Sequence, residues 1–443
     1  MAALSSNRNL LVLCYSLDWH WVLSYEFLNH ENKLGVSYDV LNLSYVGEIG
    51  PRKLIKNIVG GSKLQRTILK NWKAKEILVS KHRYNWPWNN SRLNFRTIKS
   101  RVVNLESAQE AFNTIVERAG SLKPDTESHS KIIRQEITAR EKIRSALSSI
   151  DLCDYDRVVT VNGRFTKNAV VVSWAKGNNS PTKLIEFGSS ATKFEIYESS
   201  PQSMEEIESK INEYWNSADE VVREFEANSY LNKIIKNSGL SEIDWRNSMK
   251  PGEAPKKGTK KICTFFSSTE LEYIGVGDPI PNENFQNQVA AFKALVNLLD
   301  KEDWDIYLRM HPNNPKNKIQ GAESFIWDEF KGFGHIKIIP SDSNVDSLEL
   351  GRVSDLIVSF GSNIAMEFVA RGISNVLTLG PAPWNKLLPK LYKPDLNSLS
   401  NYIKYGDEEI NIRDIYPWAY FVSTFGTDFE IFNFNAKKSK WSF

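Results

Sequence analysis

Two side chains that can bind anions follow a predicted strand directly, within residues 306–315 (IYLRMHPNNP). Apolar residues alternate along this strand, so Arg309 lies on the opposite face from them, and His311 falls where the strand ends. Pro312 cannot continue a hydrogen-bonded ladder, because it has no amide hydrogen. In open α/β sheets, ligands bind at the carboxyl ends of the strands. A guanidinium and an imidazole at that place therefore indicate a site for a phosphorylated ligand.

Small polar residues lie at the ends of two more predicted strands of the second half, KICTFFSS and DLIVSFGS: Ser267, Ser268, Gly361, Ser362 and Asn363. Because the ends of parallel strands lie along one edge, we expect these residues to converge with the Arg-x-His segment. Gly361 would let a ligand approach the backbone closely, and Glu367, about one helical turn further, could accept hydrogen bonds from ribose hydroxyls. The alternative is that Ser362 or Asn363 only caps the following helix.

Strand-like and helical segments alternate along the chain and must position these residues. NLLVLCYS, a helical segment and VSYDVLNLS follow one another near the N-terminus, which predicts a parallel, doubly wound sheet. A stretch rich in Pro, Gly and Lys at 247–261 is the best linker, and the alternation starts again after it. We expect an α/β chain with a Rossmann-like domain at 1–248, which carries a helical insertion, and a second one at 259–415. A C-terminal tail at 416–443 is expected to pack back toward the first domain.

The composition and the motifs exclude several classes of function. The 443 residues carry a net charge of +3, with 25% charged and 12% aromatic residues, which is typical of a globular protein and gives no case for binding nucleic acid. A Walker A segment, a Gly-rich dinucleotide fingerprint and a Gly-x-Ser-x-Gly elbow are all missing, which argues against an ATPase, a dehydrogenase and an α/β-hydrolase. Asp154 and Asp156 precede their strand, at the wrong end of the sheet for a catalytic metal. We therefore expect no metal and no bound cofactor.

The cysteines and the hydropathy pattern predict the compartment. Cys14, Cys153 and Cys263 are far apart in apolar segments, which favours buried thiols in a reducing compartment. No apolar run reaches the ~18 residues that span a bilayer, and the N-terminus lacks the pattern of a signal peptide. We expect a cytoplasmic protein. The basic segment 51–75 could touch an anionic membrane surface, although a solvated helix face is the simpler interpretation.

The segment YLRMHP, followed about 40 residues later by VSDLIVSFGSNIAMEFVARGISNVLTLG, resembles the capsular-polysaccharide synthesis glycosyltransferases. These are GT-B enzymes that include the CMP-Kdo-dependent transferases, and the segment is also similar to sialyl- and glycerophosphotransferases that use cytidine nucleotides. TVNGRF and LIEFGSS resemble the pattern of the first domain in this group, and the likeness covers residues 155–385. One departure is residues 362–364 (SNI), where the group has a run of small residues.

The resemblance implies a GT-B fold, in which two Rossmann-like domains with parallel sheets face a central cleft. It also implies that the second domain binds a nucleotide-sugar through its phosphate and ribose. By position, His311 of the His-Pro motif (His311, Pro312) would contact the phosphate. Ser362 would support it, and Glu367 would bind the ribose. Positive charge from Arg309 and His311 would then replace a metal ion as the phosphate leaves.

The first domain would bind the acceptor and supply the base. Asp18 could deprotonate an acceptor hydroxyl, as an inverting transferase needs, or could only cap its helix. His20 would face the same cleft or be an ordinary helix residue. Asn162 and Arg164 follow another strand, where Arg164 could bind the carboxylate of an acidic sugar or be an exposed turn residue. Glu186 is a second candidate for a catalytic carboxylate, or a helix-capping partner.

We therefore expect a metal-independent glycosyltransferase that transfers a sugar to a bacterial surface glycan or a lipid-linked acceptor. The donor is expected to be a CMP-activated acidic sugar such as Kdo or sialic acid, and the acceptor a capsular polysaccharide or lipopolysaccharide precursor near the inner membrane. One alternative is a UDP- or GDP-sugar transferase or a CDP-alditol phosphotransferase on the same fold. Another is a non-catalytic glycan-binding or export-associated subunit. Protection from thermal unfolding by nucleotides separates these alternatives.

Overall fold

A computed structural model describes most of the chain, and its contacts divide the chain into two compact units. The described residues are 8–44, 46, 64, 65, 67, 68, 76–79, 109–119, 127–236, 252–268, 284–311, 327–406, 410–435 and 440–442. Unit 1 consists of Met1–Arg118, Pro124–Pro201 and Phe425–Phe443, and unit 2 of Ala119–Lys123 and Gln202–Thr424. Pro312, most of the basic segment 51–75 and the Trp-rich residues that follow it lie outside the described residues.

Unit 1 contains a mostly parallel sheet with the strand order β12-β6-β5-β4-β1-β2-β3. Its strands are β1 (Asn9–Leu13), β2 (Tyr38–Asn42), β3 (Glu76–Val79), β4 (Arg157–Val161), β5 (Thr182–Phe187), β6 (Lys193–Tyr197) and β12 (Thr427–Asp428). The five strands from β5 to β3 pair in parallel, whereas β6 pairs antiparallel with β5 and with β12. The predicted strand–helix–strand unit is therefore confirmed. Sequence reasoning missed β6 (KFEIY).

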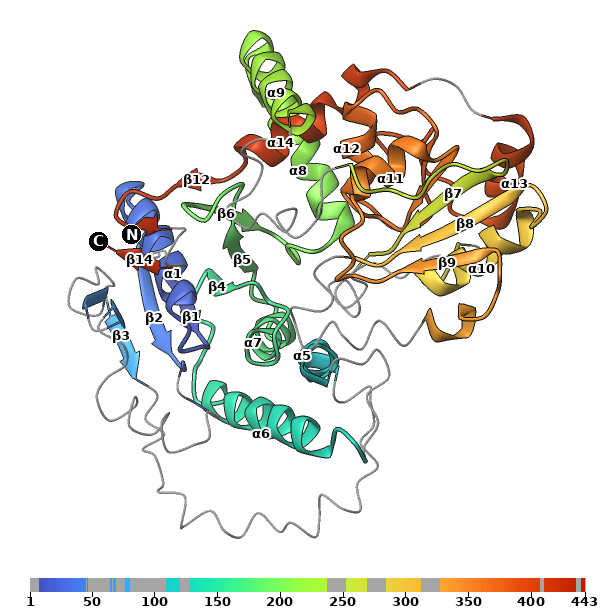
Figure 1. The fold of residues 1–443 in the computed structure, drawn as a ribbon. Coiled ribbons are helices and arrows are strands. Elements are labelled where there is room, and N and C mark those ends of the chain that lie inside the picture. Colours follow the sequence, from blue (N-terminus) through green and yellow to red (C-terminus); the bar gives the residue numbers. More distant parts are fainter. Residues whose placement is uncertain are drawn as a thin grey trace. The chain divides into compact units, whose positions relative to one another are not determined.

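Helices cover both faces of the unit 1 sheet (Figure 1). Leu11 and Leu13 of β1 pack with α1 (Asp18–Lys33) on one face. Leu10 and Val12 pack with α6 (Ser130–Leu147) and α7 (Thr166–Gly177) on the other. Alternate residues of a strand point to opposite faces, so the continuous apolar run NLLVL indicates a strand that is buried on both sides. A further helix, α5 (Gln109–Ala119), precedes α6.

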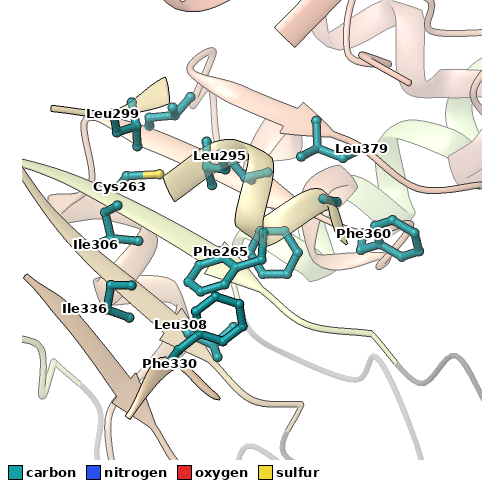
Figure 2. Packing of buried hydrophobic residues seen from close by; sticks show 14 of the residues in the cluster. Cys263, Phe265, Leu295, Leu299, Ile306, Leu308, Phe330, Ile336, Phe360 and Leu379 are labelled. Carbon is teal, nitrogen blue, oxygen red and sulfur yellow. The ribbon is translucent and has the colours of Figure 1, made fainter. Parts of the chain in front are cut away.

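Unit 2 contains a parallel sheet with the order β11-β10-β7-β8-β9. Its strands are β7 (Lys261–Phe266), β8 (Trp304–Arg309), β9 (Ile336–Ile339), β10 (Leu356–Ser359) and β11 (Val376–Thr378). Helices α10 (Gln288–Leu298) and α13 (Leu396–Tyr405) cover one face, where Phe265 and Leu308 join the core cluster of Figure 2. On the other face lie α11 (Ser347–Val353) and α12 (Ile364–Ala370), with the rings of Phe266 and Phe368 5.3 Å apart. The chain thus has two Rossmann-like α/β units.

The units divide the chain at other positions than the linker predicts. Helices α8 (Met204–Ser217) and α9 (Glu220–Ile235) count with unit 2 and not with the first domain. The reason is that they pack on α14 (Tyr416–Thr424), as in the ring contact of Tyr214 with Phe421. Of the predicted tail, α14 therefore stays with unit 2, and the chain belongs to unit 1 again only from Phe425 onward.

The end of the chain is held in unit 1 by a buried carboxylate. Glu26 of α1 is 1% exposed and accepts hydrogen bonds from the backbone N–H groups of Glu430, Ile431 and Phe432 at 3.0, 2.8 and 2.6 Å. A short antiparallel pair, β13 (Asn433–Asn435) and β14 (Lys440–Ser442), follows. The contact joins residues about 400 positions apart and closes unit 1.

Two further predictions from the sequence concern the burial of the cysteines and helices that could cross a membrane. Cys14 and Cys263 are buried, as predicted, but Cys153 is exposed. The prediction for Cys153 was wrong because this residue lies in a turn before β4 and not in the strand itself. Across the described part of the chain, no helix combines the length and the apolarity that crossing a bilayer requires.

Candidate functional site

The three motif-bearing strands of unit 2 are neighbours in its sheet. β7 pairs in parallel with β8 on one side and with β10 on the other, and Phe266 lies level with both Arg309 and Ser359. The residues that follow these strands therefore leave the sheet at the same edge. β8 and β9 lie to one side of β7, and β10 and β11 to the other. The direction in which successive strands are added to the sheet therefore reverses between β7 and β10, and open α/β sheets bind ligands at such a switch point.

Hydrogen bonds hold the segments that follow β7 and β8. The backbone N–H of His311 donates to the hydroxyl of Ser267 at 2.9 Å. The fully buried amide of Gln288 accepts from the Ser268 N–H at 3.0 Å and donates to the Ser268 carbonyl at 3.2 Å. The backbone at this edge is thus fixed by two buried side chains.

His311 is partly exposed at this edge and is neutral at pH 7. Burial, helped by the positive charge of Arg309, lowers the pKa of His311 to about 4. A neutral imidazole offers one N–H donor and one acceptor nitrogen. The ring can therefore donate a hydrogen bond to a phosphate oxygen, and a bound anion would favour its protonated form.

Arg309 is buried and bonds to the segment that follows β9. Its side chain is 1% exposed, and its guanidinium donates to Ser347 Oγ, Pro340 O, Ser343 O and Val345 O. Burial lowers the pKa of Arg309 to about 10, opposed by the charges of Asp342 and Asp346. These bonds tie the segment between β9 and α11 to β8. The sequence pattern could not reveal them, because every partner lies more than 30 residues away. Arg309 thus supports the sheet edge, and its predicted contact with a phosphate stays a prediction.

The residues at the start of α12 contact mainly one another and the helix itself. Asn363 occupies the N-cap position without a side-chain cap, and the Ser362 hydroxyl accepts from the Ile364 N–H at 3.5 Å. Glu367 Oε2 lies 3.7 Å from Arg371 Nη1 within the same helix. The partly buried Glu367 therefore has a cation beside it, and its proposed contact with ribose stays a prediction.

Gly361 allows the turn between β10 and α12. Its φ is +73°, and a Cβ atom at this residue would lie 2.2 Å from the carbonyl oxygen of Pro381. We expect Gly361→Ala to lower the free energy of unfolding of unit 2 by about 2 kcal/mol or more, because it adds a steric clash to the left-handed backbone. Gly372 is the matched control, since it has a φ of +74° and nothing within 4 Å of its Cβ position. In urea denaturation, equal losses for the two alanine variants would contradict the role of the Pro381 contact.

Unit 1 has the same kind of switch point. β2 and β3 lie to one side of β1, and β4 and β5 to the other. The predicted residues follow the adjacent strands β1 and β4 or end β5, so the topology brings all of them to one edge of the sheet: Asp18, His20, Asn162, Arg164 and Glu186. This edge is the second place where the fold favours a ligand.

Glu186 and Asn162 form the tightest contact of this edge. Asn162, with an unusual φ of 62°, donates from Nδ2 to Glu186 Oε2 at 2.5 Å and accepts the backbone N–H of Arg164 at Oδ1, at 3.0 Å. Burial raises the pKa of Glu186, while the Asn162 hydrogen bond, the Phe187 N–H and the charge of Arg164 oppose the increase. A non-glycine residue in this backbone region is costly and often marks a functional site. The partly exposed Glu186 carboxyl has the raised pKa that suits a general base.

Asp18 and His20 differ from each other in their surroundings. Asp18 is exposed and accepts a hydrogen bond from Gln65 Nε2 at 3.0 Å, and the N-cap residue of α1 is Leu17. His20 is 1% exposed, with its ring 5.2 Å from that of Tyr15 and 3.9 Å from that of Trp19. These surroundings make Glu186 a better candidate for the base than Asp18. His20 is a buried residue at the same edge of the sheet.

Two residues that sequence reasoning missed support these edges. Gln288 looks like an ordinary helix residue, yet it holds the Ser268 backbone. Lys167, in the first turn of α7, is only 4% exposed. The position of Lys167, two residues after the segment TVNGRF, could have drawn attention to it. Its burial, however, depends on the tertiary fold. Among the described residues, no three His, Cys, Asp or Glu side chains come together as a metal site.

Comparisons with known proteins show distant likeness to solved structures. No protein-family model matches the chain, and no curated protein matches it in sequence. A β-Kdo 2,4 transferase, KpsC of Thermosulfurimonas dismutans, is 11% identical over 60% of this chain and 80% of its own, with a TM-score of 0.40. UDP-GlcNAc 2-epimerase of Methanocaldococcus jannaschii is 12% identical over 92% and 97%, with a TM-score of 0.31. The calicheamicin glycosyltransferase CalG4 is 11% identical over 94% of each chain, with a TM-score of 0.27. At these values none of them assigns an activity to the chain.

Proposed function

We propose that the protein is a glycosyltransferase of the GT-B type, with its donor bound by unit 2 and its acceptor by unit 1. One observation carries the proposal. In each sheet, the polar motifs that the sequence singles out lie at the carboxyl ends of the two parallel strands that flank the topological switch point and of one neighbouring strand, β8 in unit 2 and β5 in unit 1. Ligand sites of doubly wound sheets occur at this point. A chain with two such sites is suited to bind two substrates.

In unit 2 the donor's phosphate would contact the edge formed by Ser267, His311 and the backbone at Gly361. The neutral imidazole of His311 supplies an N–H donor, and Gln288 keeps the neighbouring backbone in place. Glu367 is proposed to contact the ribose. The proposed donor is a CMP-activated acidic sugar, with no metal ion or cofactor required.

In unit 1 the acceptor hydroxyl would meet Glu186. We propose an inverting reaction in which Glu186 takes the hydroxyl proton while the acceptor oxygen bonds to the anomeric carbon of the donor. The bond from that carbon to the phosphate oxygen breaks, and its electron pair stays on the phosphate. His311 would donate a hydrogen bond to the phosphate as its charge grows. The acceptor is proposed to be a surface glycan or a lipid-linked glycan, reached through peripheral contact with the inner membrane.

A thermal-shift panel with CMP, CDP, UDP, GDP and ADP tests the donor assignment. We expect CMP to raise the melting temperature of the wild type and to lose most of this effect in His311→Ala, because a ligand stabilises the state that binds it. His335→Ala is the matched control, since His335 immediately precedes β9 at the opposite edge of the same sheet. Stabilisation by UDP or GDP alone would refute the CMP donor. CDP alone would favour an alditol phosphotransferase, and no shift with any nucleotide would refute the transferase.

Nucleotide affinity should also depend on pH through His311. The pKa of this residue is about 4 without ligand, and a bound phosphate anion raises it. Binding then takes up a proton, so affinity is expected to increase as the pH falls through the raised value toward 4. Titration calorimetry between pH 5 and pH 8 measures this slope, which should be reduced in His311→Ala. An equal slope in this variant would place the proton uptake on another group or on the nucleotide itself.

A further inference from the structure

A buried lysine and a buried histidine lie on the two sides of the unit 1 switch point. His20 follows β1, in the first turn of α1, and Lys167 follows β4, in the first turn of α7. Their side chains are 1% and 4% exposed. Both approach one ring, because the Tyr15 centroid is 5.2 Å from the His20 ring and 4.9 Å from Lys167 Nζ. Tyr15 is the partly exposed member of this cluster.

The two side chains present hydrogen-bond donors. Lys167 Nζ donates to the carbonyl oxygen of Ser44 at 3.4 Å, and its positive charge acts on the His20 ring. Burial and the nearby Lys167 charge lower the pKa of His20 to about 3. The imidazole is therefore neutral at pH 7, yet neither of its ring nitrogens has a hydrogen-bond partner among the described residues. Leaving such buried polar atoms unpaired destabilises a fold, which a core kept only for stability would avoid.

We propose that His20 and Lys167, beside Tyr15, form a subsite that binds an anionic oxygen group of the acceptor. The ammonium supplies the charge, and the imidazole supplies a neutral N–H for a second oxygen. The inference rests on the proposed function only in naming the ligand an acceptor. The anionic group is either the carboxylate of a sugar acid or the phosphate of a phosphorylated glycan.

Calorimetric titration of the full chain with three probes tests the subsite. The probes are the methyl α-glycoside of N-acetylneuraminic acid, the methyl ester of the same glycoside, and N-acetylglucosamine 1-phosphate. We expect the free acid or the phosphate to bind, and the neutral ester to bind about tenfold more weakly or worse, because a charged hydrogen bond is lost. Preference for the acid assigns a carboxylate, and preference for the sugar phosphate assigns a phosphate. No binding of either anion, or binding of the ester as tight as that of the preferred anion, would overturn the proposal.

Variants of the two residues locate the binding. Lys167→Met and His20→Phe are each expected to weaken the preferred anion about tenfold or more. Lys176→Met is the matched control, because it makes the same change at an exposed position of the same helix. Wild-type affinity in both His20→Phe and Lys167→Met would refute the subsite.

Stability separates this role from a purely structural one. His20→Phe removes two unpartnered ring nitrogens and keeps an aromatic ring, so its melting temperature should not fall while its affinity does. If Lys167→Met fails to fold, His20→Phe alone decides. The donor assignment in unit 2 is tested separately from the subsite, because His311→Ala should leave anion binding in unit 1 unchanged. Loss of CMP protection with retained anion binding would reject the donor site and keep the subsite.

Discussion

Replacing Glu186 by glutamine is expected to lower kcat by about 100- to 10,000-fold, the usual contribution of a general base. The amide keeps the size of the side chain and can still accept a hydrogen bond from Asn162 Nδ2, but it cannot take a proton from the acceptor hydroxyl. Because unit 2 is unaltered, protection by CMP should remain as in the wild type. The measurement is release of CMP from a CMP-sugar in the presence of acceptor glycans.

The pH dependence gives this prediction a direction. Burial raises the pKa of Glu186 above its ordinary value of 4.5, so the acidic limb of kcat/KM should lie above pH 4.5 and disappear in Glu186→Gln. The raised pKa also means that the folded protein binds this proton more tightly than the unfolded chain. Stability is therefore lost as the pH rises through the folded value, and Glu186→Gln should not be less stable than the wild type at neutral pH.

Two control variants separate Glu186 from its neighbours. Asp18→Asn changes the other candidate carboxylate, which is exposed and bonded to Gln65. Glu195→Gln changes the residue directly opposite Glu186 on β6. Both should retain most of the activity. A loss of 100-fold or more in Asp18→Asn, with an active Glu186→Gln, would assign the base to Asp18 instead.

Replacing Glu26 by alanine should destabilise unit 1 by about 3 kcal/mol or more. The variant removes a buried acceptor and leaves three backbone N–H groups, of Glu430, Ile431 and Phe432, without their partner, and each such loss costs about 1–3 kcal/mol when the group is buried. For a unit of this size, we expect the melting temperature to fall by roughly 6 °C or more. Calorimetry on the full chain measures the change.

The matched control for Glu26 lies in the same contact region. Glu430→Ala removes an exposed carboxylate that pairs with Lys33 and Asn29, and exposed ion pairs contribute about 1 kcal/mol or less. Glu26→Gln keeps one acceptor oxygen and should lie between the two. If Glu26→Ala melts like Glu430→Ala, the C-terminal segment is held mainly by the packing of Phe432 against the core.

Local sequence patterns contain the signal for where strands end and helices start in this protein. Pro312 and the apolar alternation before it predicted that β8 ends close to His311, and β8 does end at Arg309. At the start of α8, the pattern Ser-x-x-Glu is likewise local, and the Ser203 hydroxyl accepts the Glu206 N–H at 3.4 Å. Strand ends and helix caps depend on residues within a few positions of each other, so the sequence alone contains the necessary signal.

Partners and burial were decided only by the tertiary structure. The guanidinium of Arg309 bonds to a segment more than 30 residues away, and Glu26 bonds to residues about 400 positions away. The proposal of Glu186 as the base also rests on the tertiary structure, since desolvation by the surrounding fold raises the pKa of Glu186. By itself, the sequence determined which residues reach the two sheet edges. Which of them face a ligand depends on side chains that folding brings together from distant parts of the chain, and no local pattern specifies those.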